Sequence, residues 1–249
     1  MTGRTVAVVQ ARMGSTRLPG KVMLPLLGEP ALTLVLRRLG RARTLDEVVV
    51  ATTPLPEDEP IVELAERTGY RVVRGSETDV LDRYLAAARA TDAGVVVRIT
   101  SDCPLIDPDV VNLVVDEFRA SGVDFASNML VPWTFPVGLA VEVMSRAALE
   151  QAGREDGDPA WREHVTPYLY RHPELFRLLR VPADSDHSER RWTLDTPQDY
   201  AVVARIFDTL GRDDFGWRDA LAVVEANPSW GSANHDVVQK IVPPANFGH

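Results

Sequence analysis

Apolar residues follow two alternating patterns along the first 127 residues of the chain. Short runs rich in β-branched residues are typical of buried strands, and they lie at Thr5–Gln10, Glu47–Thr52, Arg71–Arg74, Gly94–Ile99 and Asp124–Ser127. Apolar residues spaced three and four positions apart predict helices over residues 32–39, 81–88 and 111–118. Because strands alternate with helices, we expect an α/β fold with a doubly wound, mainly parallel sheet that helices cover on both faces.

The pattern becomes less regular after Asn128. Residues Met129–Val137 are apolar and aromatic and include two prolines, which favours an arm inserted into the fold. Thr196-Pro197 begins a helix, because Thr caps well and Pro suits the first helical position. Other helices are predicted near Ser145–Gln151, Pro159–Arg171 and Gly216–Ala226, with strands near Gly138–Met144, Phe176–Val181 and Arg191–Leu194. Residues 227–249 predict a tail packed on the surface, so residues 1–249 are expected to form one domain.

The composition is that of an ordinary globular protein with an acidic balance. Lys and Arg number 27 against 36 Asp and Glu, which gives a formal charge of −9. This charge argues against a dedicated nucleic-acid binder and against a polybasic membrane-surface protein. The richest apolar stretch, Val22–Leu36, is interrupted by Pro25, Gly28, Glu29 and Pro30 and is shorter than the roughly 20 residues that span a bilayer.

Cysteine and histidine usage bears on location and on metal chemistry. One cysteine, Cys103, permits no internal disulfide and fits a reducing cytoplasm, and the N-terminal residues lack a cleavable signal pattern. Five scattered histidines show no spacing typical of a zinc site. We therefore expect a cytoplasmic protein without nucleic-acid or membrane partners.

The connection after the first strand carries the strongest chemical signal. It is longer than the roughly two to six residues usual for such a turn, and it brings Arg12, Arg17 and Lys21 to the carboxyl end of the strand. Gly14 and Ser15 allow close approach of the backbone to an anion. Three cations within ten residues are enough to neutralise a triphosphate. The alternative is a solvated basic loop.

This loop differs from the common phosphate-binding motifs. The spacing from Gly14 to Gly20-Lys21 is one residue too long for a Walker loop, and Val22 stands where Ser or Thr would hold magnesium. The Gly-x-Gly-x-x-Gly pattern is also absent from it.

Two aspartates are predicted to meet at the same edge of the sheet. Asp102 follows the fourth predicted strand and Asp195 follows a late one. Neither has a cation close in sequence, apart from Arg190 and Arg191, so the two carboxylates would repel each other unless a divalent ion joined them. Magnesium suits such carboxylates together with phosphate oxygens. The alternatives are a turn or cap for Asp102 and a helix cap for Asp195.

The motif Arg12-x-Gly14-Ser15-x-Arg17-Leu18-Pro19-x-Lys21 resembles the nucleotide-binding loop of the CMP-sugar synthetases that activate sialic acids and 3-deoxy-octulosonic acid. It is most similar to the cytidylyltransferase family named after spore coat polysaccharide biosynthesis. The resemblance covers about residues 5–210 and continues through Val48–Thr53, Arg74–Tyr84, Arg98–Asp107, Arg162–Tyr168 and Leu194–Asp199. It implies a Rossmann-like nucleotidyltransferase fold, and it implies that Asp102 and Asp195 hold a catalytic Mg²⁺.

The resemblance also implies where CTP binds. Residues Gln10 and Ala11 would contact the base, and the segment Gly75–Arg83 would hold the cytidine. Within the second segment the implied contacts are Ser76, Asp82 and Arg83, the last two with a helical surface pair as the alternative. Thr100 is a further implied nucleotide contact, although the octulosonate synthetases carry glutamine there, which separates this chain from their sugar specificity.

The second half of the chain would then border the acceptor. Glu142, His164 and Arg191 lie beyond the nucleotide-binding half of about residues 1–127 and are candidate acceptor contacts. A lone histidine is more often structural, and Arg191 has the alternative of flanking an edge strand. Residues 128–249 would form the acceptor and dimerisation half and the tail. In relatives an arm in this region crosses to a second subunit, which predicts a homodimer; the alternative is a loop folded back on its own core.

The implied activity is magnesium-dependent transfer of a cytidylyl group from CTP to a sugar acid, with release of pyrophosphate. Arg12, Arg17, Lys21 and Asp102 are the expected catalytic residues. A phosphonate or a sugar phosphate remains open as the acceptor. One alternative is a glycosyltransferase that uses Asp107-Pro108-Asp109 as its metal motif, and another is a nucleotide-binding subunit without catalysis.

Overall fold

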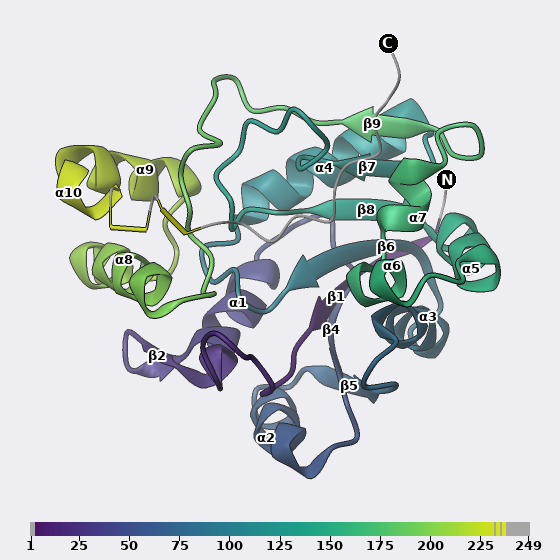
Figure 1. The fold of residues 1–249 in the computed structure, drawn as a ribbon, viewed down its shortest axis with the longest axis horizontal. Coiled ribbons are helices and arrows are strands. Elements are labelled where there is room, and N and C mark those ends of the chain that lie inside the picture. The colour runs from purple at the N-terminus through teal and green to yellow at the C-terminus, as the bar shows by residue number, and fades with distance from the viewer. Residues whose placement is uncertain (1–2, 232, 235, 238–249) are drawn as a thin grey trace.

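The computed structural model describes residues 3–231, 233–234 and 236–237. Its main sheet has the strand order β5-β4-β1-β6-β8-β7-β9 (Figure 1). The parallel strands are β1 (Arg4–Gln10), β4 (Glu47–Thr52), β5 (Arg71–Arg74) and β6 (Ala93–Thr100). Strand β8 (Glu142–Ser145) runs antiparallel to β6 and to β7 (Phe125–Ser127), and β9 (Leu178–Arg180) is parallel to β7. A separate antiparallel pair joins β2 (Pro25–Leu26) to β3 (Glu29–Pro30).

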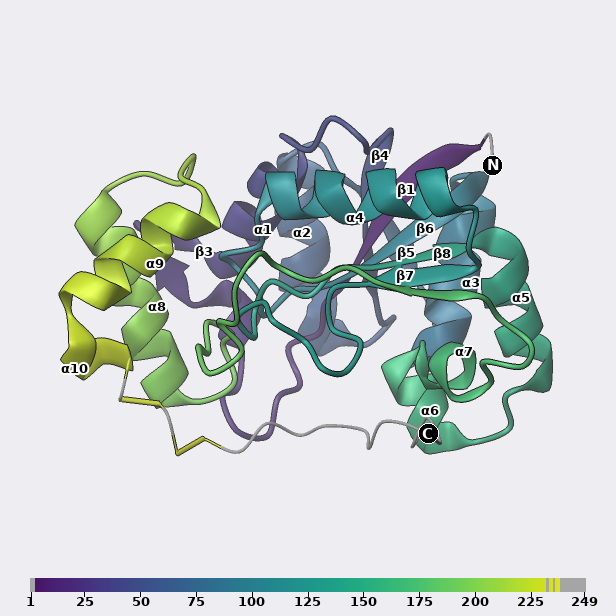
Figure 2. The same ribbon diagram turned by 90° about the horizontal axis from the view of Figure 1, so that it is seen from above.

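Helices cover both faces of this sheet, as Figure 2 shows edge-on. One face carries α1 (Ala31–Leu39), α2 (Glu59–Arg67) and α4 (Pro108–Ser121). The other carries α3 (Val80–Ala90), α5 (Arg146–Glu155), α6 (Pro159–His164) and α7 (Pro167–Arg171). Helices α8 (Pro197–Leu210), α9 (Trp217–Ala226) and α10 (Pro228–Gly231) gather at one end. Short 3₁₀ helices span Lys21–Met23 and Pro56–Asp58.

The apolar sequence of β1 explains its central position in the sheet. Ala7 and Val9 pack into the core cluster beneath α1 and α4, whereas Val6 and Val8 pack into the cluster beneath α3 and α5. Successive side chains of a strand point to opposite faces, so a strand covered on both faces needs an unbroken apolar run. The doubly wound α/β fold expected from the sequence is confirmed.

One helix was missed and three local expectations were wrong. Helix α2 occupies a segment for which no helix was predicted. The helix expected over Pro159–Arg171 is two helices, because Val165 adopts a φ of 70° between them. Strand β8 begins at Glu142 rather than at Gly138. The expected strand Arg191–Leu194 forms one isolated bridge, between Val137 and Arg191, since no further partner strand lies beside it.

The segment Met129–Val137 packs against its own chain. The ring of Phe135 is buried, and its centroid lies 5.6 Å from that of Trp217. The Thr134 hydroxyl accepts a hydrogen bond from the backbone N–H of Ala183 at 2.7 Å. Val131 nevertheless leaves 44% of its surface exposed. Among the described residues, no helix has the length and apolar character to cross a membrane.

Candidate active site

The basic loop after β1 is anchored at both ends. The backbone N–H of Met13 donates to the buried carboxylate of Asp58 at 2.6 Å, and Asp58 also accepts from the hydroxyl of Thr53. The N–H of Gly20 returns to the carbonyl of Met13 at 3.1 Å, and Gly20 adopts a left-handed φ of 64°. These contacts close the loop and direct Lys21 into the cleft rather than into solvent.

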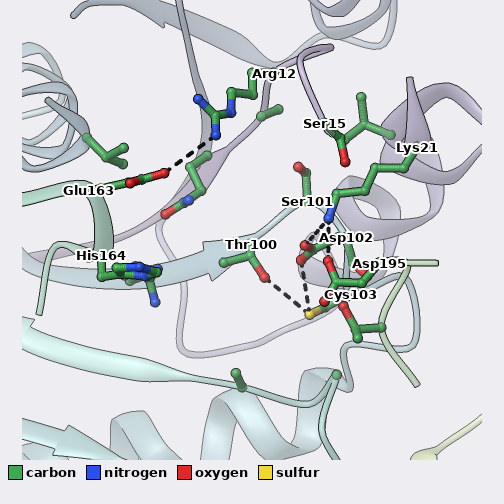
Figure 3. Close-up of a pocket in the computed structure, with 18 of the residues that line it drawn as sticks. Arg12, Ser15, Lys21, Thr100, Ser101, Asp102, Cys103, Glu163, His164 and Asp195 are labelled. Carbon is green, nitrogen blue, oxygen red and sulfur yellow. Dashed lines mark hydrogen bonds and ion pairs between the residues drawn. The ribbon is translucent and has the colours of Figure 1, made fainter. Parts of the chain in front are cut away.

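Lys21 lies between the two predicted metal-binding carboxylates (Figure 3). Its Nζ is 2.6 Å from Asp102 Oδ2 and 2.8 Å from Asp195 Oδ1. Arg17 Nη2 lies 3.0 Å from Asp195 Oδ2, and Arg191 Nη2 lies 2.8 Å from the same oxygen. The carboxylates therefore meet as predicted, but they are joined by cations distant in sequence, whereas the sequence analysis weighed only cations close in sequence. Lys21 is 81 and 174 positions away from them, so only the fold brings it there.

The charges of this cluster stabilise one another. Burial opposes ionisation of Asp102, but the Lys21 ammonium and the Thr100 hydroxyl outweigh burial and hold the pKa of Asp102 below its usual value. Burial likewise lowers the pKa of Lys21, yet the two carboxylates raise it more. Burial and the negative charge of Asp102 raise the pKa of Cys103, so its thiol stays protonated near neutral pH.

Backbone contacts fix the two carboxylates relative to each other. The carbonyl of Asp102 accepts from the N–H of Leu194 at 2.8 Å and from the hydroxyl of Thr193 at 3.2 Å. The chain that leads to Asp195 is therefore joined to the end of β6. Their shared position at the carboxyl edge of the sheet follows from these bonds and from the strand order.

A cavity of about 440 Å³ surrounds this cluster. It brings together most of the residues predicted from the sequence, namely Gln10, Ala11, Arg12, Gly14, Ser15, Arg17, Lys21, Arg83, Thr100, Asp102, His164 and Asp195. Gln10 and Thr100 are paired neighbours in β1 and β6, so they line the cavity side by side at the ends of these strands. Arg12 and Glu163 approach to 3.6 Å across another part of the cavity (Figure 3).

Two predicted cytidine contacts lie at the start of α3 rather than among the residues that line the cavity. The Ser76 hydroxyl accepts from the N–H of Asp79 at 3.1 Å. Asp79 caps α3 by accepting from the N–H of Asp82 at 2.9 Å, while the side chain of Asp82 is exposed. Both residues thus organise the helix that carries Arg83.

Arg83 is the most distinctive cation of the cavity. Only 2% of its surface is exposed, and its Nε and Nη1 have no hydrogen-bond partner in the described part of the chain. Burial lowers its pKa, and the nearby positive charge of Arg12 adds to that effect. A Cβ at Gly75 would lie 2.8 Å from Arg83 Cγ, so glycine there leaves room for the side chain. A buried, unsatisfied guanidinium favours an anionic or carbonyl-bearing ligand.

Arg98 is a site residue that the sequence analysis missed. It lines the cavity from β6, directly opposite Glu142 in β8, and the two side chains form an ion pair. Glu142 also accepts from the hydroxyl of Thr166 at 2.9 Å, whereas Arg98 Nε is buried without a partner among the described residues. The sequence did offer a signal for it. Arg98 is the one charged residue of this largely apolar strand, and it lies on the same face as Thr100.

Two further predicted residues have well-defined surroundings. Burial and the charge of Arg98 lower the pKa of His164, so its imidazole is neutral near pH 7. Arg191 is buried and pairs with Asp195 and Asp199 instead of lining the cavity.

The aspartates of the alternative glycosyltransferase motif serve the fold. Asp107 caps α4 by accepting from the N–H of Asp109 at 2.7 Å. Its other oxygen accepts from the N–H of Trp217, and only 2% of the residue is exposed. Asp107 is therefore committed to holding α9 against α4.

A doubly wound sheet with a basic loop and convergent carboxylates at its carboxyl edge is the architecture of a nucleotidyltransferase. The comparisons with known proteins agree. A family model described as Cytidylyltransferase matches residues 6–214, and the chain belongs to this family.

Individual relatives match over most of their length. Spore coat polysaccharide biosynthesis protein SpsF of Bacillus subtilis is 31% identical over 229 residues, which cover 89% of this chain and 94% of that protein. The 3-deoxy-manno-octulosonate cytidylyltransferase of Solibacter usitatus is 34% identical over 236 residues, covering 86% and 91%. A solved cytidylyltransferase from Leptospira borgpetersenii superposes with a TM-score of 0.88 at 35% identity, covering 92% of this chain and 96% of that one.

Proposed function

We propose that this nucleotidyltransferase transfers a cytidylyl group from CTP to a sugar acid, with Mg²⁺ as cofactor and pyrophosphate as leaving group. The observation that carries the proposal is the convergence of Asp102 and Asp195 on the Lys21 ammonium of the basic loop. The names of the relatives support cytidylyl transfer in carbohydrate biosynthesis.

The donor set at this point fits a hard divalent cation. Asp102 Oδ2 and Asp195 Oδ1 both lie within 2.8 Å of one ammonium nitrogen, so a single positive ion can contact both. Magnesium is commonly held by one or two carboxylates, with phosphate oxygens and water completing the shell. Bound there with CTP, it would polarise the α-phosphate.

The residues of the chain would act mainly by position and charge. Lys21 and Arg17 pair with the two carboxylates in this structure. With Mg²⁺ in place of the Lys21 ammonium, Arg12, Arg17 and Lys21 would bind the β- and γ-phosphates and stabilise the charge that grows on them as pyrophosphate departs. The acceptor oxygen would form a bond to the α-phosphorus while the bond from that phosphorus to pyrophosphate breaks. Gln10 and Ala11 would contact the base, and Nε and Nη1 of Arg83, which lack hydrogen-bond partners among the described residues, would donate to the nucleotide.

We assign the acceptor to the part of the cavity beyond Thr100. Arg98 and neutral His164 line it, and Glu142, which is not among the lining residues, orients Arg98 through their ion pair. Arg98 Nε is a donor still in need of a partner, which suits a carboxylate or another anionic group of the acceptor.

We further propose that residues 1–249 act as one domain and assemble as a homodimer in the cytoplasm. Residues of about 1–127 would bind the nucleotide, and residues 128–249 would supply the acceptor side and the subunit contact. Exposure of Val131 within the segment Met129–Val137 supports the contact, and the buried free thiol of Cys103 supports a reducing compartment.

The activity is tested by incubating the protein with CTP, Mg²⁺ and a panel of sugar acids, sugar phosphates and phosphonates while detecting pyrophosphate. Release that depends on both CTP and a sugar acid is the expected result. Comparable turnover with ATP or GTP would contradict the proposal. So would an absence of pyrophosphate release together with release of a nucleoside diphosphate from a nucleoside-diphosphate sugar.

A further inference from the structure

The chain returns to the active site after α9 and α10. Asn234 is 3% exposed, and its side-chain amide donates two hydrogen bonds. One goes to Asp199 Oδ1 at 2.8 Å and the other to the backbone carbonyl of Arg191 at 2.9 Å. Both amide hydrogens of Asn234 are thus used on residues next to the metal-binding carboxylate.

Asp199 links Asn234 to the side chain of Arg191. Asp199 is fully buried and accepts from Arg191 Nε at 2.9 Å and from Arg191 Nη2 at 3.2 Å. It also accepts from the backbone N–H of Thr196 at 3.0 Å, which completes the capping box of α8. A capping box needs Thr196 and Asp199 alone, so the contacts with Arg191 and Asn234 go beyond what the helix requires.

Arg191 in turn fixes the orientation of Asp195. Arg191 Nη2 donates to Asp195 Oδ2 at 2.8 Å, and Asp195 Oδ1 is left facing Lys21. Rotation of the Asp195 carboxylate would break the contact of Oδ2 with Arg191. The Arg191 guanidinium keeps its orientation because it also donates to Asp199. Asn234 in turn is hydrogen-bonded to Asp199 and to the backbone carbonyl of Arg191.

We propose that Asn234 is a positioning residue of the active site, which acts through Asp199 and Arg191 to aim Asp195 Oδ1 at the cation site. The inference rests on the proposed function, since it assumes that Asp195 holds a divalent ion. It makes Asn234, which lies beyond α10, part of the active site. Partners behind metal ligands typically change metal affinity or activity about 10- to 100-fold when removed.

The test compares Asn234→Ala and Asn234→Asp with the control Asn227→Ala. Asn227 also donates its side-chain amide to one backbone carbonyl, that of Val223 at 2.9 Å, at the end of α9. Binding of Mn²⁺ in the presence of a non-transferable CTP analogue is followed by electron paramagnetic resonance of the free ion. Thermal unfolding of each variant is measured alongside.

We expect Asn234→Ala to weaken Mn²⁺ binding about tenfold and to raise the half-saturating Mg²⁺ concentration similarly. Asn234→Asp should be worse, because a carboxylate would face Asp199. Asn227→Ala should match the wild-type protein in metal binding. If Asn234→Ala lowers only the unfolding temperature and leaves Mn²⁺ affinity unchanged, Asn234 is purely structural and the proposal is overturned. If the wild-type protein binds no Mn²⁺, the proposed function fails, and with it this inference.

Discussion

At the scale of single residues, the site is organised by charge compensation. Lys21 joins the carboxylates of Asp102 and Asp195, whose like charges would otherwise repel each other, and Arg17 and Arg191 share the outer oxygen of Asp195. The buried Arg83 lacks such compensation. An anion is thus favoured beside Arg83, as the binding of a nucleotide phosphate or base carbonyl requires.

Replacing Arg17 by Ala tests the role of the basic loop. The change removes a donor whose contact should strengthen as pyrophosphate leaves, so we expect a loss of about 2–4 kcal/mol in transition-state stabilisation. Arg17→Lys should restore little, because the bidentate fork is lost. Steady-state kinetics with CTP measure the effect. Arg43→Ala is the control, since Arg43 is an exposed partner of Asp116, and near-normal turnover of Arg17→Ala would contradict the triphosphate assignment.

His164 predicts a pH dependence of stability. Its folded-state pKa lies below the ordinary value of 6.5, so the unfolded chain binds more protons as the pH falls through and below 6.5. Stability should therefore fall as the pH drops from about 7.5 towards the folded-state pKa. His164→Gln should lose less stability over the same range. Denaturant unfolding at several pH values measures this, and parallel curves for both proteins would refute the assignment.

At the scale of elements, the sequence and the structure agree where the pattern is local. The apolar runs of β1, β4, β5 and β6 and the helix start at Thr196 could be predicted, because strand periodicity and capping act over a few residues. The basic loop and Asp102 could be placed at one edge, because parallel strands share their carboxyl ends. Asp195 was placed there through a predicted strand that forms only one isolated bridge, and hydrogen bonds from Leu194 and Thr193 to the Asp102 carbonyl bring it to this edge instead.

Contacts between distant segments could not be predicted in the same way. Lys21 between the carboxylates, Arg98 opposite Glu142 and Asn234 against Asp199 depend on strand order and on the path of the chain after α9. Arg191 could not be assigned correctly for the same reason. From the sequence, a basic residue near a predicted strand suggested a contact with the acceptor. Its ion pairs with Asp195 and Asp199 appear only in the folded chain.

The crossing of residues 137–138 with the chain before Asp195 yields a test at this scale. Gly138 has a φ of 112°, and a Cβ there would lie 2.6 Å from the backbone carbon and oxygen of Trp192. Gly138→Ala should therefore cost at least about 2 kcal/mol in the free energy of unfolding. Gly157→Ala is the control, because no atom lies within 4 Å of its added Cβ. Denaturant unfolding compares the two, and equal stability would show that the crossing can relax.

At the scale of the whole molecule, the two halves of the chain meet around one cavity. The first supplies the basic loop, Arg83 and Asp102, whereas the second supplies His164 and Asp195. Each half alone lacks one of the two carboxylates. The segment Met129–Val137 lies at the surface of this arrangement and also packs on its own chain through Phe135.

The proposed homodimer predicts a solution mass of twice the 27.5 kDa of the chain. Light scattering at micromolar concentration measures it. Val131→Asp should shift the protein towards the monomer, because Val131 is exposed and a charge there would oppose an apolar contact. A wild-type mass of 27.5 kDa would count against the subunit contact.

The most direct test of the central claim is the Mg²⁺ dependence of pyrophosphate release in Asp102→Asn and Asp195→Asn. Each change keeps the shape of the side chain and removes one negative charge from the cation site. The account predicts that each variant folds, loses most turnover and needs more Mg²⁺ for its residual rate, whereas Asp116→Asn, at an exposed pair with Arg43, behaves as wild type. If Asp195→Asn lowers thermal stability but leaves the Mg²⁺ dependence unchanged, Asp195 is structural and the two-carboxylate site is contradicted.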